Sequence, residues 1–164
     1  IRNRGTIGGN LATASPAGDA LPPLAIGGAE VECVSVRGTR RVPLGEFITG
    51  VKQTELAPDE LISAVWIDPS AAPQTFMKVG TRNAMVIAVV SLALSAGDEL
   101  CAAVGSATPR PVIIRAPRSQ AADFPAFVAA AATPIDDLRG SAAYRRHALR
   151  VLTRRALERT LAAL

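Results

Sequence analysis

A short segment near the middle of the chain, Ile67 to Pro73, most constrains how these 164 residues can fold. It contains two prolines, three small residues and one acid, and this composition favours extended, exposed backbone. A helix or a central strand would not run through such a segment, because proline lacks the N–H group that both need. We therefore expect two domains, residues 1–70 and 74–164, with a boundary near residue 70.

The residue patterns on the two sides of this boundary predict different elements. Runs rich in Val, Ile and Trp, bounded by turn residues, indicate strands before it, and an apolar run that returns after Ala96-Gly97-Asp98 indicates a hairpin after it. Ser141 is a good N-cap, and no Gly or Pro follows it, which predicts a long amphipathic helix at the end. The expected strands are 30–36, 61–67, 75–79, 85–95 and 99–104, and the expected helices are 123–132 and 142–164. Strands followed by helices indicate an α+β fold.

The composition argues against several classes of function. The formal net charge is +4, but the basic residues lie beside acids or along the last helix, without interleaved aromatic residues, so we expect no nucleic-acid partner. One histidine and two cysteines, Cys33 and Cys101, are too few for a zinc or iron–sulfur site. No apolar run reaches the length of a transmembrane helix, so we expect no membrane span, and the default compartment is the reducing cytoplasm.

The segment Arg4-Gly5-Thr6-Ile7-Gly8-Gly9-Asn10 predicts an anion-binding loop. Its glycines allow positive φ and a close approach to a ligand, successive exposed N–H groups suit a diphosphate, and Thr6 and Asn10 add side-chain donors. No Lys-Ser or Lys-Thr pair follows the glycines and no helix clearly follows, so the segment is neither a P-loop nor a Rossmann fingerprint. Taken alone, it is equally compatible with a plain tight turn.

Four segments, in order along the whole chain, resemble the molybdenum hydroxylase flavoproteins. Thr6 to Asn10, continued by Ala12 to Pro16 and by Asp19, resembles the second FAD-binding loop of the medium subunit in the carbon monoxide dehydrogenase and xanthine dehydrogenase family. Pro58 to Ile62 resembles the family motif at the start of a strand, Phe76 to Arg82 its Phe-x-Lys-x-x-x-Arg segment, and Arg139 to Arg146 the signature of its C-terminal domain. The family's earlier glycine-rich loop has no counterpart here, so we expect that an N-terminal part is missing and that the flavin site is incomplete.

The resemblance implies a fold, a cofactor and a set of contacts. The first domain would be the C-terminal portion of a FAD-binding domain of the vanillyl-alcohol-oxidase type, and the second a small antiparallel sheet with helices. The implied FAD contacts are Thr6, Ile7, Gly8, Gly9 and Asn10 at the diphosphate, Thr13 and Asp19 along the ribityl chain and flavin ring, and Leu61 and Lys78. Without the resemblance, we would place Leu61 in a strand core and Lys78 on the surface. Arg139, Ser141 and Tyr144 are expected to fix the start of the last helix.

By the same resemblance, the chain would be an electron-transfer subunit of a hetero-oligomer. A molybdenum-binding large subunit, with molybdopterin, would oxidise the substrate. An iron–sulfur small subunit would pass the electrons through two-iron clusters to FAD, and then to NAD, a quinone or oxygen. The chemistry belongs to the cofactor, so we expect no catalytic side chain and no metal ligand here. Two alternatives remain open: a docking module that binds partner subunits without FAD, and a stand-alone flavin oxidase.

Overall fold

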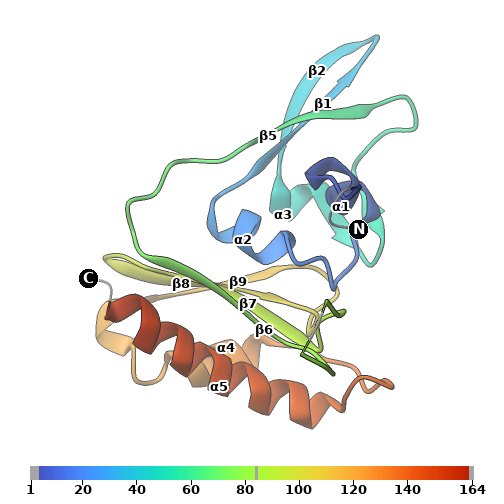
Figure 1. The fold of residues 1–164 in the computed structure, drawn as a ribbon. Coiled ribbons are helices and arrows are strands. Elements are labelled where there is room, and N and C mark those ends of the chain that lie inside the picture. The colour runs from blue at the N-terminus through green and yellow to red at the C-terminus, as the bar shows by residue number, and fades with distance from the viewer. Residues whose placement is uncertain (1–3, 84, 163–164) are drawn as a thin grey trace.

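The computed structural model describes residues 4–83 and 85–162. The chain forms two parts, and the elements of the first part end at Trp66 (Figure 1). The elements of this part are α1 (Ile7–Thr13), α2 (Leu21–Ile26), β1 (Glu30–Ser35), β2 (Gly38–Pro43), α3 (Leu44–Phe47), β3 (Ile48–Gly50), β4 (Gln53–Thr54) and β5 (Leu61–Trp66). Strand β1 is the centre of an antiparallel sheet of order β2-β1-β5. Alternate residues of β1, Val31 and Cys33, point into a core that contains Leu11 and Phe47, as the period of two along a strand requires.

The second part is a four-stranded antiparallel sheet covered by two helices. Its elements are β6 (Gln74–Val79), β7 (Val90–Ala96), β8 (Glu99–Gly105), β9 (Val112–Pro117), a 3-10 turn at Arg118–Gln120, α4 (Phe124–Ala131) and α5 (Ala142–Leu161). The strands follow one another in the order β6-β7-β8-β9. Leu92 and Leu94 of β7 pack with Leu149 and Leu152 of α5 in one buried core.

The two parts share the middle layer of the molecule. Figure 1 shows α4 and α5 on one side of the four-stranded sheet and α2, from the first part, on the other. Small residues on that second face allow α2 to approach closely. Ala103 of β8 belongs to the core of the first part, and a Cβ atom added at Gly105 would lie 2.8 Å from Cγ of Pro22. The central strands β7 and β8 are therefore buried on both faces.

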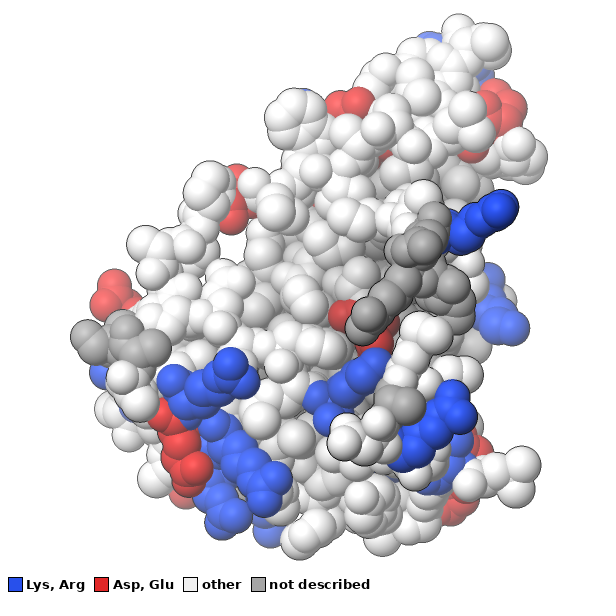
Figure 2. All heavy atoms as spheres, viewed as in Figure 1, with Lys and Arg blue, Asp and Glu red and all other residues white. Residues whose placement is uncertain are grey.

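The last helix follows its sequence pattern closely. Ser141 caps it by accepting a hydrogen bond from the Tyr144 N–H at 3.2 Å, as expected. Its buried face carries aliphatic side chains, whereas His147 and the arginines at 146, 150 and 154 are exposed. Figure 2 shows basic side chains gathered over the lower, helical part of the molecule. Within the described ranges, no helix is both long and apolar enough to cross a membrane.

Several expectations about the elements were wrong or incomplete. The expected strands at 30–36, 61–67, 75–79 and 99–104 are confirmed to within one residue or two, but the strand expected from Met85 begins only at Val90. Four further strands and three short helices, α1, α2 and α3, were not predicted; α2 carries prolines in its first turn, where proline is tolerated but disguises a helix. The last helix ends at Leu161, and residues 163 and 164 of the expected range lie outside the described residues.

Candidate functional site

The glycine-rich segment forms a short helix and not the expected open loop. Thr6 is the N-cap of α1, and its Oγ1 accepts a hydrogen bond from the Gly9 N–H at 2.9 Å. Gly8 and Gly9 lie inside the helix, and the described glycines with positive φ are Gly28 and Gly38. A Cβ atom at Gly9 would lie only 3.0 Å from Thr6 Oγ1, so glycine here allows a close cap. The expected positive-φ anion loop is therefore wrong, and the N–H groups of a first helical turn take its place.

The N-terminal end of α1 opens into a cleft between the two parts of the molecule, with a volume of about 820 Å³. Five of the nine residues expected to contact FAD line this cleft: Thr6, Ile7, Asn10, Asp19 and Lys78. The second part contributes further walls from residues 81–82 and 85–87 and from Arg139. Lys78, Arg82 and Arg139 face a single acid, Asp19, among the lining residues, so the cleft carries an excess of positive charge that suits an anionic ligand.

An ion pair joins the two parts across the cleft. The Lys78 ammonium group donates to Oδ2 of Asp19 and, at 3.2 Å, to the backbone carbonyl of Val86. Gly80 allows Val86 to lie close beside Lys78, because a Cβ atom at Gly80 would lie 2.1 Å from a methyl group of Val86. The expected contacts Asp19 and Lys78, separated by 59 positions in sequence, are thus brought into direct contact.

Two polar atoms of the cleft residues lack partners within the described chain. Oδ1 of Asn10 and Oδ1 of Asp19 are buried without a hydrogen bond. Buried polar atoms are nearly always hydrogen-bonded in native proteins, and exceptions point to a missing water, ion or ligand. Such acceptors at one end of a positively charged cleft fit a ligand that offers both hydroxyl or N–H donors and negative charge, which FAD does.

The other expected contacts lie outside the cleft. Thr13 turns its hydroxyl back onto the Gly9 carbonyl at 2.7 Å, and Gly8 faces Ile62 of β5, 3.9 Å from the position of an added Cβ atom. Leu61, at the start of β5, is 73% exposed, so its assignment to a strand core was wrong. The cleft residues that were not expected to contact FAD include Thr81, Arg82, Met85, Val86, Ile87 and Arg139. Thr81, Arg82 and Arg139 lie inside the segments that carry the resemblance, and this was the only available signal.

A second group of charges fixes the start of α5 beside the cleft. Asp137 accepts hydrogen bonds from the Arg139 guanidinium at 2.6 Å and from its backbone N–H at 2.8 Å, and also from Arg145 at 2.6 Å. Arg145 is fully buried and donates in addition to the backbone carbonyls of Val89 and Ser106. The hydrogen bonds from Arg139, with support from Arg145, hold the pKa of Asp137 well below its usual range. The expected structural role of Arg139 at the start of the helix is confirmed, and its guanidinium group also reaches the cleft.

Sequence comparisons relate this geometry to known proteins. Residues 1–70 match the family described as FAD binding domain in molybdopterin dehydrogenase. The nicotine 6-hydroxylase medium subunit of Paenarthrobacter nicotinovorans is 34% identical in a match that covers 96% of this chain and 61% of that protein. The nicotinate dehydrogenase FAD-subunit of Eubacterium barkeri is 41% identical over 55% of this chain and 32% of its own length.

Solved structures share the whole fold. The Cu,Mo-CO dehydrogenase in its cyanide-inactivated form matches with a TM-score of 0.86 and 25% identity, over 99% of this chain and 63% of that chain. Quinoline 2-oxidoreductase from Pseudomonas putida 86 matches with the same TM-score and identity, over 99% and 62%. The first domain is thus of the class that binds FAD in molybdopterin dehydrogenases. The chain belongs to the flavoprotein, or medium-subunit, family of the molybdenum hydroxylases, its expected α+β fold is confirmed, and it spans about three-fifths of the length of these relatives.

Proposed function

We propose that the cleft between the two parts binds FAD and that the protein is the flavoprotein component of a molybdenum hydroxylase. The observation that carries the proposal is the convergence of Asn10, Asp19 and Lys78 on one positively charged cleft that retains buried, unpartnered acceptor atoms. The family match of residues 1–70 supports the same cofactor.

Each group has a role that follows from its chemistry. The N–H groups in the first turn of α1 would bind the diphosphate, because a helix N-terminus favours anions. Asn10 and Asp19 would accept hydrogen bonds from hydroxyl or ring N–H groups, and Lys78 would hold the Asp19 carboxylate in place. Gly8, Gly9, Thr13 and Leu61 remain proposed contacts on the strength of the resemblance alone. The division into residues 1–70 and 74–164 likewise remains a proposal.

FAD would supply the redox chemistry, since a flavin accepts and releases electrons that side chains cannot hold. By family membership, the electrons would come from a molybdenum-binding large subunit through the iron–sulfur clusters of a small subunit, in a cytoplasmic hetero-oligomer. They would leave to NAD, a quinone or oxygen. The residues of this chain then bind, orient and electrostatically tune the cofactor, and no side chain acts as an acid, base or nucleophile.

A docking module without FAD is the second candidate, and one observation favours it. Ile7, Met85 and Ile87 are each more than half exposed at the rim of the cleft, and exposed apolar groups at a concave surface are typical of protein interfaces. The same surface would serve a docking role or a flavin role. The amount of FAD bound per chain therefore distinguishes the two.

The test is the flavin released on denaturation of the full-length protein and of two variants. We expect about one FAD per chain in the wild type, and a large loss of flavin or a shifted flavin potential in Asp19→Ala. Asp98→Ala is the matched control, because Asp98 lies in the exposed β7–β8 turn, and it should retain its flavin. Wild-type flavin content and potential in Asp19→Ala would contradict the proposed site, and a flavin-free wild type would favour the docking module.

A further inference from the structure

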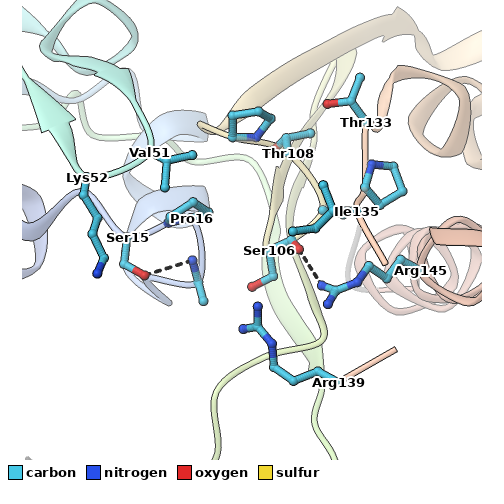
Figure 3. Close-up of a pocket in the computed structure, with 14 residues that line it drawn as sticks. Ser15, Pro16, Val51, Lys52, Ser106, Thr108, Thr133, Ile135, Arg139 and Arg145 are labelled. Atoms are coloured by element: carbon cyan, nitrogen blue, oxygen red, sulfur yellow. Dashed lines mark hydrogen bonds between the residues drawn. The ribbon is translucent and has the colours of Figure 1, made fainter. Parts of the chain in front are cut away.

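A second hollow lies beside the cleft, where the two parts of the molecule meet (Figure 3). Its volume is about 310 Å³, and it shares Ala17 and Arg139 with the cleft. Four segments form its walls: the loop 15–17, the turn after β3 at 51–52, the segment 106–109 after β8, and the segment 133–135 after α4. A molecule in this pocket would therefore be separated from the cleft by one layer of residues.

Unusual backbone conformations gather at this pocket. In the described chain, the non-glycine residues with positive φ are Ala14 at 44°, Lys52 at 55° and Ser106 at 61°. Lys52 and Ser106 line the pocket and Ala14 adjoins it. Hydrogen bonds hold these residues in place, from the Lys52 N–H to the Ala14 carbonyl at 3.0 Å and from the Ser106 N–H to the Pro16 carbonyl at 2.8 Å. Left-handed backbone in non-glycine residues is unfavourable and clusters at ligand sites.

The lining chemistry restricts what could bind. Apolar walls come from Pro16, Val51, Pro109, Pro134 and Ile135. Polar groups at the pocket include the side chains of Lys52 and Arg139, and the Ser106 hydroxyl, which is buried with no hydrogen-bond partner within the described chain. Arg139 uses Nε and Nη2 to bind Asp137, and Figure 3 shows its guanidinium group directed into the pocket, toward Ser106. No carboxylate is among the lining residues.

We propose that this pocket binds a quinone, which accepts the electrons that leave the flavin. The inference rests on the proposed function. A quinone is flat and largely apolar, and its carbonyl oxygens can accept hydrogen bonds from Arg139 and Ser106. The pocket volume is at the lower end of the ~300–1,000 Å³ usual for small-molecule sites, which suits a single ring system and is too small for a dinucleotide such as NAD. A bound quinone would take up two electrons and two protons from reduced FAD, which would leave hydroquinone and oxidised FAD.

The test measures the binding of duroquinone to the full-length protein by calorimetry, with NAD titrated in parallel. Duroquinone has a fully substituted ring and does not add to thiols, so Cys33 and Cys101 do not interfere. Ile135→Trp fills the pocket from its rim, and Ser106→Ala removes the unpartnered hydroxyl. Val36→Trp is the matched control, because Val36 is fully exposed on the β1–β2 turn, away from the pocket.

We expect saturable binding of one duroquinone, weakened about tenfold or more in Ile135→Trp and by less in Ser106→Ala, with Val36→Trp within about twofold of the wild type. The rate at which duroquinone reoxidises the reduced flavin without air should fall in the same order. Absence of binding, equal binding in Ile135→Trp, or binding of NAD that Ile135→Trp abolishes would overturn the proposal. Flavin content is measured on the same samples: loss of flavin from the wild type defeats the proposed function, whereas intact flavin without pocket-dependent duroquinone binding defeats only this inference.

Discussion

Asp137 and Asp19 each bind basic side chains at places where distant segments of the chain meet. The two sites differ in whether every carboxylate oxygen has a hydrogen-bond partner. Arg145 is fully buried and gives its donors to Asp137 and to the backbone carbonyls of Val89 and Ser106, and Arg139 binds both carboxylate oxygens of Asp137. Lys78 and Asp19, with side chains 28% and 45% exposed, leave Oδ1 of Asp19 without a partner.

This difference separates a structural role from a binding role. A buried ion pair contributes to a unique fold when all its polar atoms are satisfied, and removing one partner leaves an uncompensated charge. A half-exposed pair contributes little to stability, and a buried acceptor that it leaves without a partner points to a missing ligand, ion or water. We therefore assign the Arg145–Asp137 pair to the fold and propose that the Lys78–Asp19 pair contacts the cofactor.

The largest expected effect comes from removing the buried guanidinium group. Arg145→Met should lower the free energy of unfolding by about 3–5 kcal/mol, because it removes one of the two guanidinium groups that bind Asp137 and leaves two buried carbonyls without their donor. Arg146→Met, one position further on the exposed side of α5, is the control and should change it by less than ~0.5 kcal/mol. Urea unfolding of both variants checks this, and equal stabilities would show that the buried cluster is not structural.

Acid should lower the free energy of unfolding through the carboxylates that are satisfied by hydrogen bonds in the folded state. The pKa of Asp137 is held well below its usual range, chiefly by Arg139, and Arg40 together with the Ala57 N–H lowers the pKa of Glu60 to about 2. In the unfolded chain both groups take up protons near pH ~4. Their contribution is therefore complete above that pH and is lost as the pH falls toward the folded-state values. Unfolding free energies measured from pH 6 down to pH ~2 should fall less steeply in Asp137→Asn and Glu60→Gln than in the wild type, and parallel curves would contradict this.

A smaller change in the free energy of unfolding is expected from relieving the positive φ of Ser106. The backbone carbonyl of Ser106, which accepts a hydrogen bond from Arg145, should be unaffected. Ser106→Gly keeps that carbonyl and relieves the positive φ, so it should raise the free energy of unfolding by roughly 0.5–1 kcal/mol. Ser106→Ala removes the same hydroxyl but keeps the unfavourable φ, and is the control. Thermal unfolding of the two variants measures the difference, and a Gly variant no more stable than the Ala variant would show that this backbone conformation stores no strain.

Sequence reasoning reached the elements with strong periodicity and failed where tertiary contacts decide. The last helix and its Ser141 cap follow from local pattern. The helix α1 was missed because two glycines, each costing about 1 kcal/mol in a helix, outweighed the Thr6 cap signal. The Asp19–Lys78 contact depends on how the two parts pack, which no local pattern encodes. Arg145 could have been identified by its spacing from Ala148, Leu149 and Leu152 on the buried face of α5, although its Arg-rich surroundings suggested a solvated helix.

The proposed role of the Lys78–Asp19 pair in FAD binding is tested most directly by Lys78→Met in the full-length protein. FAD affinity and the free energy of unfolding are measured on the same flavin-free preparation. We predict that FAD binds about tenfold more weakly or worse, because the charge that holds the Asp19 carboxylate in the cleft is gone. The free energy of unfolding should change by less than ~1 kcal/mol. Unchanged FAD affinity, or a loss of stability as large as that of Arg145→Met, would contradict the assignment of this pair to the cofactor.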